Sequence, residues 1–100
     1  GTSNLLFIKN NKIFSPKRDF YKGTTFKFFS KKLKIKLTNI FVNNLNSYDE
    51  IIIIGSGKGV VSVLSIENNN WKRKSLKFYK KFTQIYKYEL NKIASRYERS

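Results

Sequence analysis

Residues 51–54 are four consecutive isoleucines, and they lead directly into the glycine cluster Gly55-Ser56-Gly57-Lys58-Gly59. Residues 60–66, Val-Val-Ser-Val-Leu-Ser-Ile, follow the cluster and are mostly β-branched or apolar. Both flanking segments therefore have the composition of β-strands. Because glycine supplies the positive φ that a tight turn requires, residues 51–66 predict a strand, a glycine turn and a second strand.

A strand that runs into glycines and a lysine is also how the phosphate-binding loops of nucleotide-binding proteins begin. The Walker loop needs four residues between its first glycine and Gly-Lys, and a Ser or Thr after the lysine. The dinucleotide-binding loop needs Gly-x-Gly-x-x-Gly. This sequence has neither spacing, and both loops require a helix immediately afterwards, where a strand is predicted here. The cluster therefore argues against a nucleotide site.

The first forty residues predict short strands and turns. Residues 4–14 place Asn10 and Asn11 between two apolar segments, which indicates a strand, a tight turn and a strand. The only proline lies in Ser-Pro-Lys-Arg at 15–18 and ends any regular element there. The aromatic segment 24–32 is included among these short strands and turns. Residues 31–41 alternate Leu and Ile with Lys, which predicts a half-buried strand with a lysine face.

From Ser75 onward the apolar residues recur every three or four positions, which is typical of one face of a helix. The predicted helix spans residues 75–96, with Ser75 as its N-cap. The positions expected to face the core are Leu76, Tyr79, Phe82, Tyr86, Leu90, Ile93 and Tyr97. Together these elements predict an α+β fold, in which a small antiparallel sheet carries a C-terminal amphipathic helix on one face. Residues 1–30 are expected to form a basic N-terminal extension with short strands, and residues 31–100 the α+β core.

The charge balance is the strongest functional signal in the composition. The 21 Lys and Arg residues against 6 Asp and Glu give a net charge of +15, which makes nucleic acid the expected partner and an anionic membrane surface the second candidate. Cys and His are absent, so no thiolate, imidazole base or histidine-bound metal is available. Asp49-Glu50 is interpreted as a polar turn before a strand. The sequence therefore predicts no enzyme activity, no catalytic residue, no metal and no cofactor.

A basic module of this kind predicts contacts to RNA phosphates. The glycine turn fits the same role, because glycines allow backbone amides to approach a phosphate and Lys58 adds charge. Trp71 either stacks on an unpaired base or covers the core at the start of the helix, and the core is favoured. The predicted RNA-binding residues are Lys17, Arg18, Lys32, Lys34, Lys36, Gly55, Gly57, Lys58, Gly59, Lys72, Arg73 and Lys74.

The order of these features resembles the bacterial-type ribosomal protein L-sixteen family (L-sixteen/L-ten-e). Residues 14–23, Phe-Ser-Pro-Lys-Arg-Asp-Phe-Tyr-Lys-Gly, are similar to that family's basic segment near the N-terminus. Residues 34–41, Lys-Ile-Lys-Leu-Thr-Asn-Ile-Phe, are similar to its strand, and Gly-Ser-Gly-Lys-Gly follows at a similar distance. The chain departs from the family in having a shorter middle portion and Ile53 where the family has arginine.

The resemblance implies a structural constituent of the large ribosomal subunit. Its implied partners are the large-subunit rRNA, neighbouring ribosomal proteins and, near the loop 55–59, tRNA. The abundance of residues with A/T-rich codons points to a mitochondrion, or another organelle such as a plastid, as the location. The alternatives are another small ribosomal or RNA-binding protein, a nucleotide-binding enzyme fragment, or a basic helix that lies on a membrane.

Overall fold

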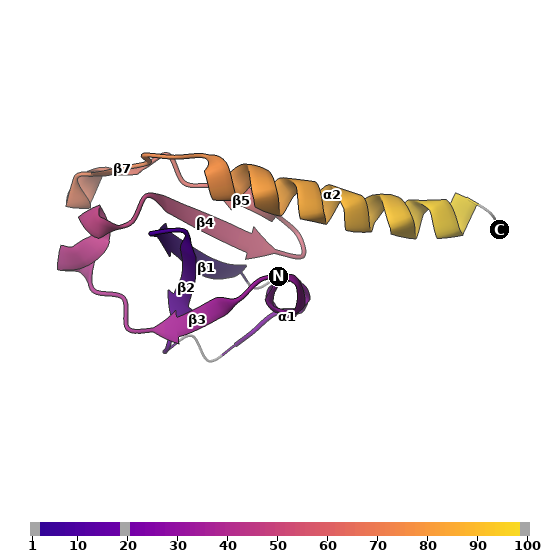
Figure 1. Ribbon diagram of the computed structural model, residues 1–100, viewed down its shortest axis with the longest axis horizontal. Helices are drawn as coiled ribbons and strands as arrows, with labels where there is room; N and C mark the ends of the chain where they lie inside the picture. The colour runs from indigo at the N-terminus through magenta and orange to yellow at the C-terminus, as the bar shows by residue number, and fades with distance from the viewer. Residues whose placement is uncertain (1–2, 19–20, 99–100) are drawn as a thin grey trace.

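The computed structural model describes residues 3–18 and 21–98 of the chain, and it shows an α+β arrangement (Figure 1). The predicted α+β class is thereby confirmed. The strands are β1 (Ser3–Lys9), β2 (Lys12–Pro16), β3 (Ile35–Thr38), β4 (Glu50–Gly55), β5 (Gly59–Ser62), β6 (Ser65–Ile66) and β7 (Trp71–Lys72). The helices are α1 (Thr24–Lys32) and α2 (Lys77–Glu98), with 3-10 turns η1 (Val42–Ser47) and η2 (Glu67–Asn69).

The main sheet has five strands in the order β3-β2-β1-β4-β5, and a separate ribbon pairs β6 with β7. All neighbours in the main sheet are antiparallel except β2 and β3, which run parallel. The sheet is therefore mixed, and the prediction of an antiparallel sheet is wrong in this respect. The sheet joins strands from both sides of residue 30, and the domain boundary expected there stays a prediction.

Helix α1 explains why β3 is parallel to β2. A parallel neighbour requires a crossover connection, usually a helix, and Thr24–Lys32 forms that helix between the two strands. The prediction of strands and turns for this segment is wrong. Its aromatic residues favour strands by propensity, but Phe26 and Phe29 lie three positions apart and both are buried on the same side of α1.

Both predicted hairpins are confirmed. In the first, β1 pairs with β2 across Asn10 and Asn11, whose φ values of 52° and 59° are those of a type I′ turn. In the second, β4 pairs with β5 across residues 56–58, and Gly59 has a φ of 70°. The second predicted strand is shorter than expected: β5 ends at Ser62, and Ser65–Ile66 belongs to the separate ribbon.

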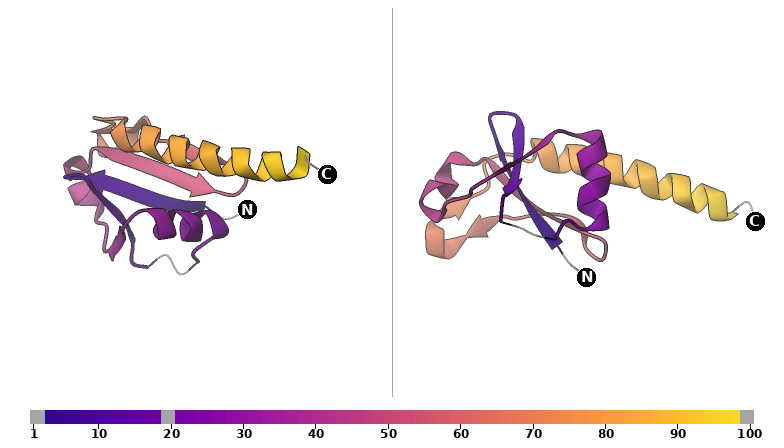
Figure 2. Two further views of the ribbon diagram at one scale, coloured as in Figure 1. Left: turned by 45° about the vertical axis from the view of Figure 1, so that its right-hand side comes forward. Right: turned by 90° about the horizontal axis from the view of Figure 1, so that it is seen from below.

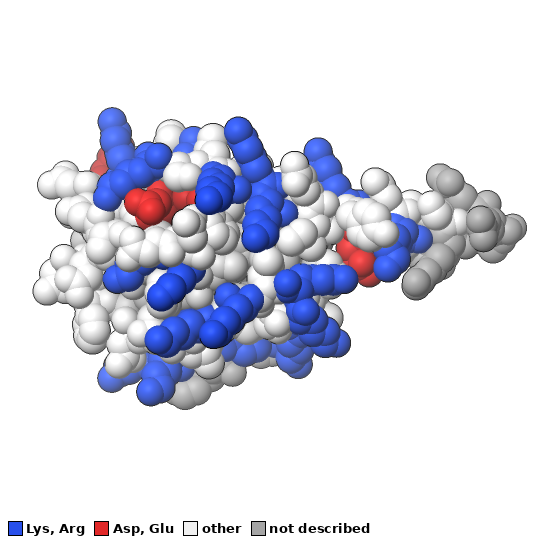
Figure 3. Space-filling model, viewed as in Figure 1, with Lys and Arg blue, Asp and Glu red and all other residues white. Residues whose placement is uncertain are grey.

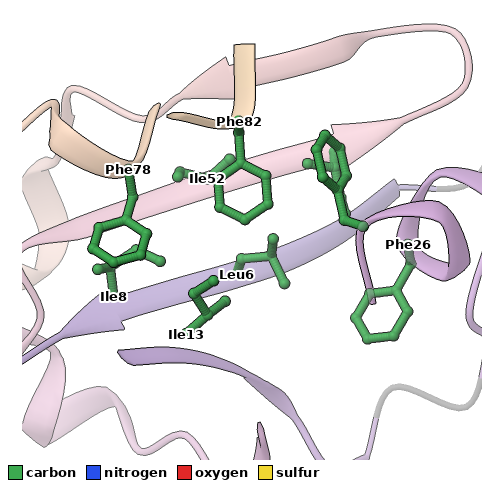
Figure 4. Close-up of a cluster of buried hydrophobic side chains, with 9 residues drawn as sticks. Leu6, Ile8, Ile13, Phe26, Ile52, Phe78 and Phe82 are labelled. Carbon is green, nitrogen blue, oxygen red and sulfur yellow. The ribbon is translucent and has the colours of Figure 1, made fainter. Parts of the chain in front are cut away.

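Three of the four isoleucines are buried and Ile53 is partly buried, because β4 lies inside the sheet with apolar groups packed on both of its faces. Ile52 and Ile54 belong to the cluster that α1 and α2 cover (Figure 4), whereas Ile51 belongs to the cluster on the opposite face. The first cluster contains Leu6, Ile8, Ile13, Phe26, Phe29, Ile52, Ile54, Phe78 and Phe82. The second contains Phe7, Leu45, Tyr48, Ile51 and Trp71. Trp71 is thus a core residue, as favoured from the sequence, and its Nε1 donates to the carbonyl of Tyr48 at 3.0 Å.

Helix α2 confirms the predicted C-terminal helix, but only its first half packs on the sheet. Phe78 and Phe82 are buried, whereas Leu90 is 48% and Ile93 is 40% exposed. Figures 1 and 2 show the reason, because the helix continues past the edge of the sheet. The predicted apolar face is therefore wrong beyond Tyr86, and the side chain of Tyr97 lies outside those described. The predicted N-cap Ser75 lies just before the helix, where its Oγ accepts a hydrogen bond from the Lys77 N–H at 3.0 Å.

The predicted half-buried alternation of residues 31–41 is only partly present. Ile35 is partly buried in β3, but Leu37 is 48% exposed. Leu37 is exposed because β3 is a short strand at the edge of the sheet, where no described element packs over it.

Tyr48 makes the stability of the fold sensitive to alkaline pH. The side chain is 4% exposed, and burial raises the pKa of its hydroxyl above the ordinary value. A raised tyrosine pKa favours the protonated form in the folded state, so its contribution is present below about pH 10 and is lost as the pH rises through the folded pKa. We expect the urea midpoint of Tyr48→Phe to fall less than that of the wild type between about pH 9 and pH 11. Equal slopes for the two proteins would contradict this prediction.

Candidate anion-binding site

A small hollow of about 180 Å³ lies where β1 begins, β4 ends and α1 begins. The sheet register brings these ends together, because Ser3 pairs with Gly55 and Asn4 with Ile54. The hollow is lined by Asn4, Tyr21, Gly23, Thr24, Thr25, Gly55 and Ser56. These residues come from three separate parts of the chain, and we refer to them as the anion cup.

The N-terminus of α1 contributes backbone N–H donors to the anion cup that no carbonyl of the helix accepts. Gly23 is the N-cap residue, has an extended backbone and makes no side-chain capping bond. The first bond of the helix runs from the Lys27 N–H to the Gly23 carbonyl, so the N–H groups of residues 24–26 have no acceptor within the helix. The first turn also contains no acidic residue. This end of the helix therefore attracts anions.

Asn4 fixes the chain that leads into α1. Its side chain is 2% exposed; Nδ2 donates to the carbonyl of Tyr21 at 2.8 Å, and Oδ1 accepts from the N–H of Gly23 at 3.2 Å. These two hydrogen bonds hold the segment before α1 against the rigid strand β1. Asn4 thus places the N-terminus of α1 beside the end of β4.

The remaining side of the cup is formed by Gly55 and Ser56. Gly55 is the buried last residue of β4, and Ser56 is exposed in the turn that follows. With Thr24 and Thr25, Ser56 brings hydroxyl groups to the hollow, and the described residues that line it include neither an acidic residue nor a lysine. Amide and hydroxyl donors without a carboxylate are suited to a phosphate group.

The glycine cluster therefore lines a hollow whose donors would suit an anion, although not in the way that a nucleotide-binding loop would. Such loops use the helix that follows the glycines, but here a strand follows them and the helix comes from residues 24–32. The sequence around the cluster does not indicate this helix, because α1 lies earlier in the chain.

The predicted RNA-binding residues do not gather in one place. Gly55 lines the anion cup, while Gly57, Lys58 and Gly59 lie in the adjacent turn and the start of β5. Lys17 and Arg18 line a second hollow beyond β2, and Lys34 and Lys36 line a third near the start of β3. Lys32 ends α1 and Lys72 lies on β7. Arg73 Nη1 donates a hydrogen bond to Ser62 Oγ, and Lys74 Nζ donates one to the carbonyl of Asn46. Figure 3 shows the basic side chains spread over one face.

The sequence interpretation missed Asn4, Thr24, Thr25 and Ser56. A usable signal was Gly23-Thr24-Thr25 directly before Phe26 and Phe29, since a glycine followed by hydroxyl residues and a three-residue apolar spacing is typical of a helix start. Within residues 3–18 and 21–98, no helix is long and apolar enough to span a membrane. The same residues hold no cluster of acidic or histidine side chains that would suit a metal ion.

A family model, amino-transferase class IV, matches residues 1–66 of the chain. Because this match covers well over half of the sequence, the chain belongs to the class IV amino-transferase family. No curated protein matches the sequence significantly.

Solved structures of two enzymes have a similar fold. The branched-chain amino acid aminotransferase from Escherichia coli is 18% identical, with a TM-score of 0.70 over 82% of this chain. A branched-chain aminotransferase from the archaeon Thermoproteus uzoniensis, solved with norvaline, is 17% identical, with a TM-score of 0.65 over 85% of this chain. The chain spans 30% of the length of each of these proteins.

The family match overturns the ribosomal interpretation. The resemblance to the L-sixteen family is wrong, and so are the predicted role in translation and the RNA and ribosomal partners. The prediction of no enzyme activity is contradicted by the family match. Glycine-rich turns with a lysine occur in unrelated proteins for the same conformational reason, so the pentapeptide carried little information about descent. The location in a mitochondrion or other organelle stays a prediction.

Proposed function

We propose that this chain is the part of a class IV aminotransferase that holds the phosphate group of pyridoxal 5′-phosphate (PLP). The observation that supports this function most directly is the anion cup, in which the N-terminus of α1 meets Gly55 and Ser56 at the end of β4. Membership of the amino-transferase family supports it independently. Aminotransferases use PLP, whose ring accepts the electrons released at the substrate carbon.

The residues of the cup fit one part of that cofactor. The amide groups of residues 24–26 and the hydroxyls of Thr24, Thr25 and Ser56 would hold the phosphate dianion. PLP enzymes also attach the cofactor through a lysine amine, and none of the described residues that line this cup is a lysine. We infer that the lysine and most of the substrate site come from the part of the enzyme that lies outside this chain, which agrees with a span of 30% of the similar enzymes.

The test compares PLP with pyridoxal, which lacks the phosphate, on the full-length protein that contains this chain. We expect PLP to bind more tightly than pyridoxal. Ser56→Ala should weaken PLP about tenfold, because it removes one hydrogen bond to a charged group, and it should leave pyridoxal binding unchanged. The affinities can be measured by equilibrium dialysis.

Ser47→Ala is a matched control, since Ser47 is also exposed but lies on η1, outside the cup. Its affinity for PLP should equal that of the wild type. If PLP and pyridoxal bind equally well, or if both serine variants weaken PLP to the same extent, the cup does not hold the phosphate.

A further inference from the structure

A larger hollow of about 340 Å³ lies at the end of the sheet where β2 and β3 begin, beside the first turns of α2. It is separate from the anion cup. Asn4 of the cup lies at the beginning of β1, whereas Asn11 of the hollow follows the opposite end of that strand. We refer to this second hollow as the lysine groove.

Among the described residues, Lys12, Lys34, Lys36 and Lys81 line the lysine groove, and no acidic residue does. Strand pairing brings the first three together, because Ile13 of β2 lies opposite Ile35 of β3. Within the described part of the chain, none of the four forms an ion pair with a carboxylate. Like charges that line one hollow repel, and an anion bound among them would relieve that repulsion.

The same groove has apolar walls. Ile13 and Phe78 are core residues, 5% and 6% exposed, and the partly buried Leu33 packs against the same cluster. Lys81 connects the two kinds of surface, because its Nζ lies 5.6 Å from the centre of the Phe78 ring. A ligand in this groove would therefore meet aromatic and aliphatic side chains as well as charge.

Lys77 stabilises one rim of the groove. Its Nζ donates to Oδ1 of Asn11 at 3.0 Å and joins the beginning of α2 to the turn between β1 and β2. The shape of the groove is thus set by a hydrogen bond between two elements that are distant in the sequence.

We propose that the lysine groove binds a small organic anion that carries a carboxylate, sulfonate or phosphate on an apolar body. The size of the hollow supports this class, since sites for small molecules begin at about 300 Å³. The apolar walls support it over a simple inorganic anion, which would use only the lysines. The proposal goes beyond the proposed PLP site and does not depend on it.

The full-length protein can be titrated with three related probes by calorimetry. The probes are 1-naphthalenesulfonate, which has both charge and an apolar body, inorganic sulfate, which has only charge, and 1-naphthalenemethanol, which has only the apolar body. We expect 1-naphthalenesulfonate to bind at least about tenfold more tightly than either of the other two, because only it uses both surfaces.

Charge reversal locates the binding. Lys34→Glu combined with Lys81→Glu should weaken 1-naphthalenesulfonate about tenfold or more. Lys87→Glu combined with Lys72→Glu is the matched control, because both lysines are exposed, lie outside the groove and change the net charge equally. The control should retain the affinity of the wild type.

Three results would overturn the proposal. The first is an affinity for sulfate equal to that for 1-naphthalenesulfonate, which would show that the apolar walls take no part. The second is an equal loss in the two double variants, which would indicate attraction to the overall positive charge. The third is no loss in Lys34→Glu/Lys81→Glu, which would be expected if the lysines only protect the free edge of β3 from pairing.

Discussion

Replacing Phe82 by alanine is expected to lower the free energy of unfolding of this part of the protein by about 4 kcal/mol. Phe82 is fully buried between α2 and the sheet. Its ring packs edge to face on that of Phe29 in α1, with the two ring centres 4.6 Å apart. Truncation would remove the apolar contacts and the aromatic pair, and it would leave a cavity between two helices and the sheet. Native-state hydrogen exchange of the β1 and β4 amides would measure the loss, because these strands are the centre of the sheet.

Leu90→Ala is the control for Phe82→Ala on the same helix. Leu90 lies on the same predicted apolar face, two turns further on, but it is 48% exposed. We expect a change of less than about 1 kcal/mol. A loss in Leu90→Ala as large as that in Phe82→Ala would mean that the distal half of α2 is buried against residues outside this chain.

The contrast between Phe82 and Leu90 shows what the periodicity of α2 could predict. The spacing identified the helix and one apolar face correctly, because these depend on local geometry. It could not indicate where the sheet ends, since that limit is set by the length of β4 and β5 rather than by the helix. Phe78 was missed for a similar reason: it lies beside the predicted face but is buried next to Ile8 and Ile13 (Figure 4).

The anion cup was less predictable than the fold. Its glycines were visible in the sequence, and the turn that they form was predicted correctly. The helix that completes the cup was not, because the aromatic residues of α1 have a high strand propensity and its burial depends on contacts with β4 and α2. The bond between Asn4 and Gly23 joins residues 19 positions apart, and nothing in either local segment indicates that partner.

The positive charge was taken to indicate nucleic acid in particular, which the charge alone does not show. A net charge of +15 indicates attraction to anions, but it does not distinguish RNA from small phosphorylated or carboxylated molecules. The structure disperses the basic residues over several surfaces, and Arg73 and Lys74 are used in internal hydrogen bonds. Net charge therefore predicts attraction to anions but could not identify the class of ligand.

Replacing Glu50 by alanine is expected to cost about 3 kcal/mol of stability, although the sequence suggested only a polar turn at this position. Glu50 is 1% exposed, and its two carboxylate oxygens accept hydrogen bonds from the N–H groups of Phe78 at 2.8 Å and Tyr79 at 3.0 Å. The side chain thus caps the N-terminus of α2 from within β4, where a negative group is favoured. Alanine would leave two buried donors without acceptors, and each such loss costs about 1–3 kcal/mol.

Two further variants separate this capping role from general packing. Glu50→Gln keeps one acceptor oxygen and nearly the same volume, so we expect a loss between those of the wild type and Glu50→Ala. Asp49→Ala changes the adjacent, less buried acid, for which no side-chain hydrogen bond is seen in the described part of the chain, and should cost less than about 1 kcal/mol. Hydrogen exchange should place the loss in Glu50→Ala first at the amides of residues 78–82, because these begin the helix that Glu50 holds. Uniform loss across the sheet with unchanged protection at the start of α2 would show that Glu50 stabilises β4 and not the helix.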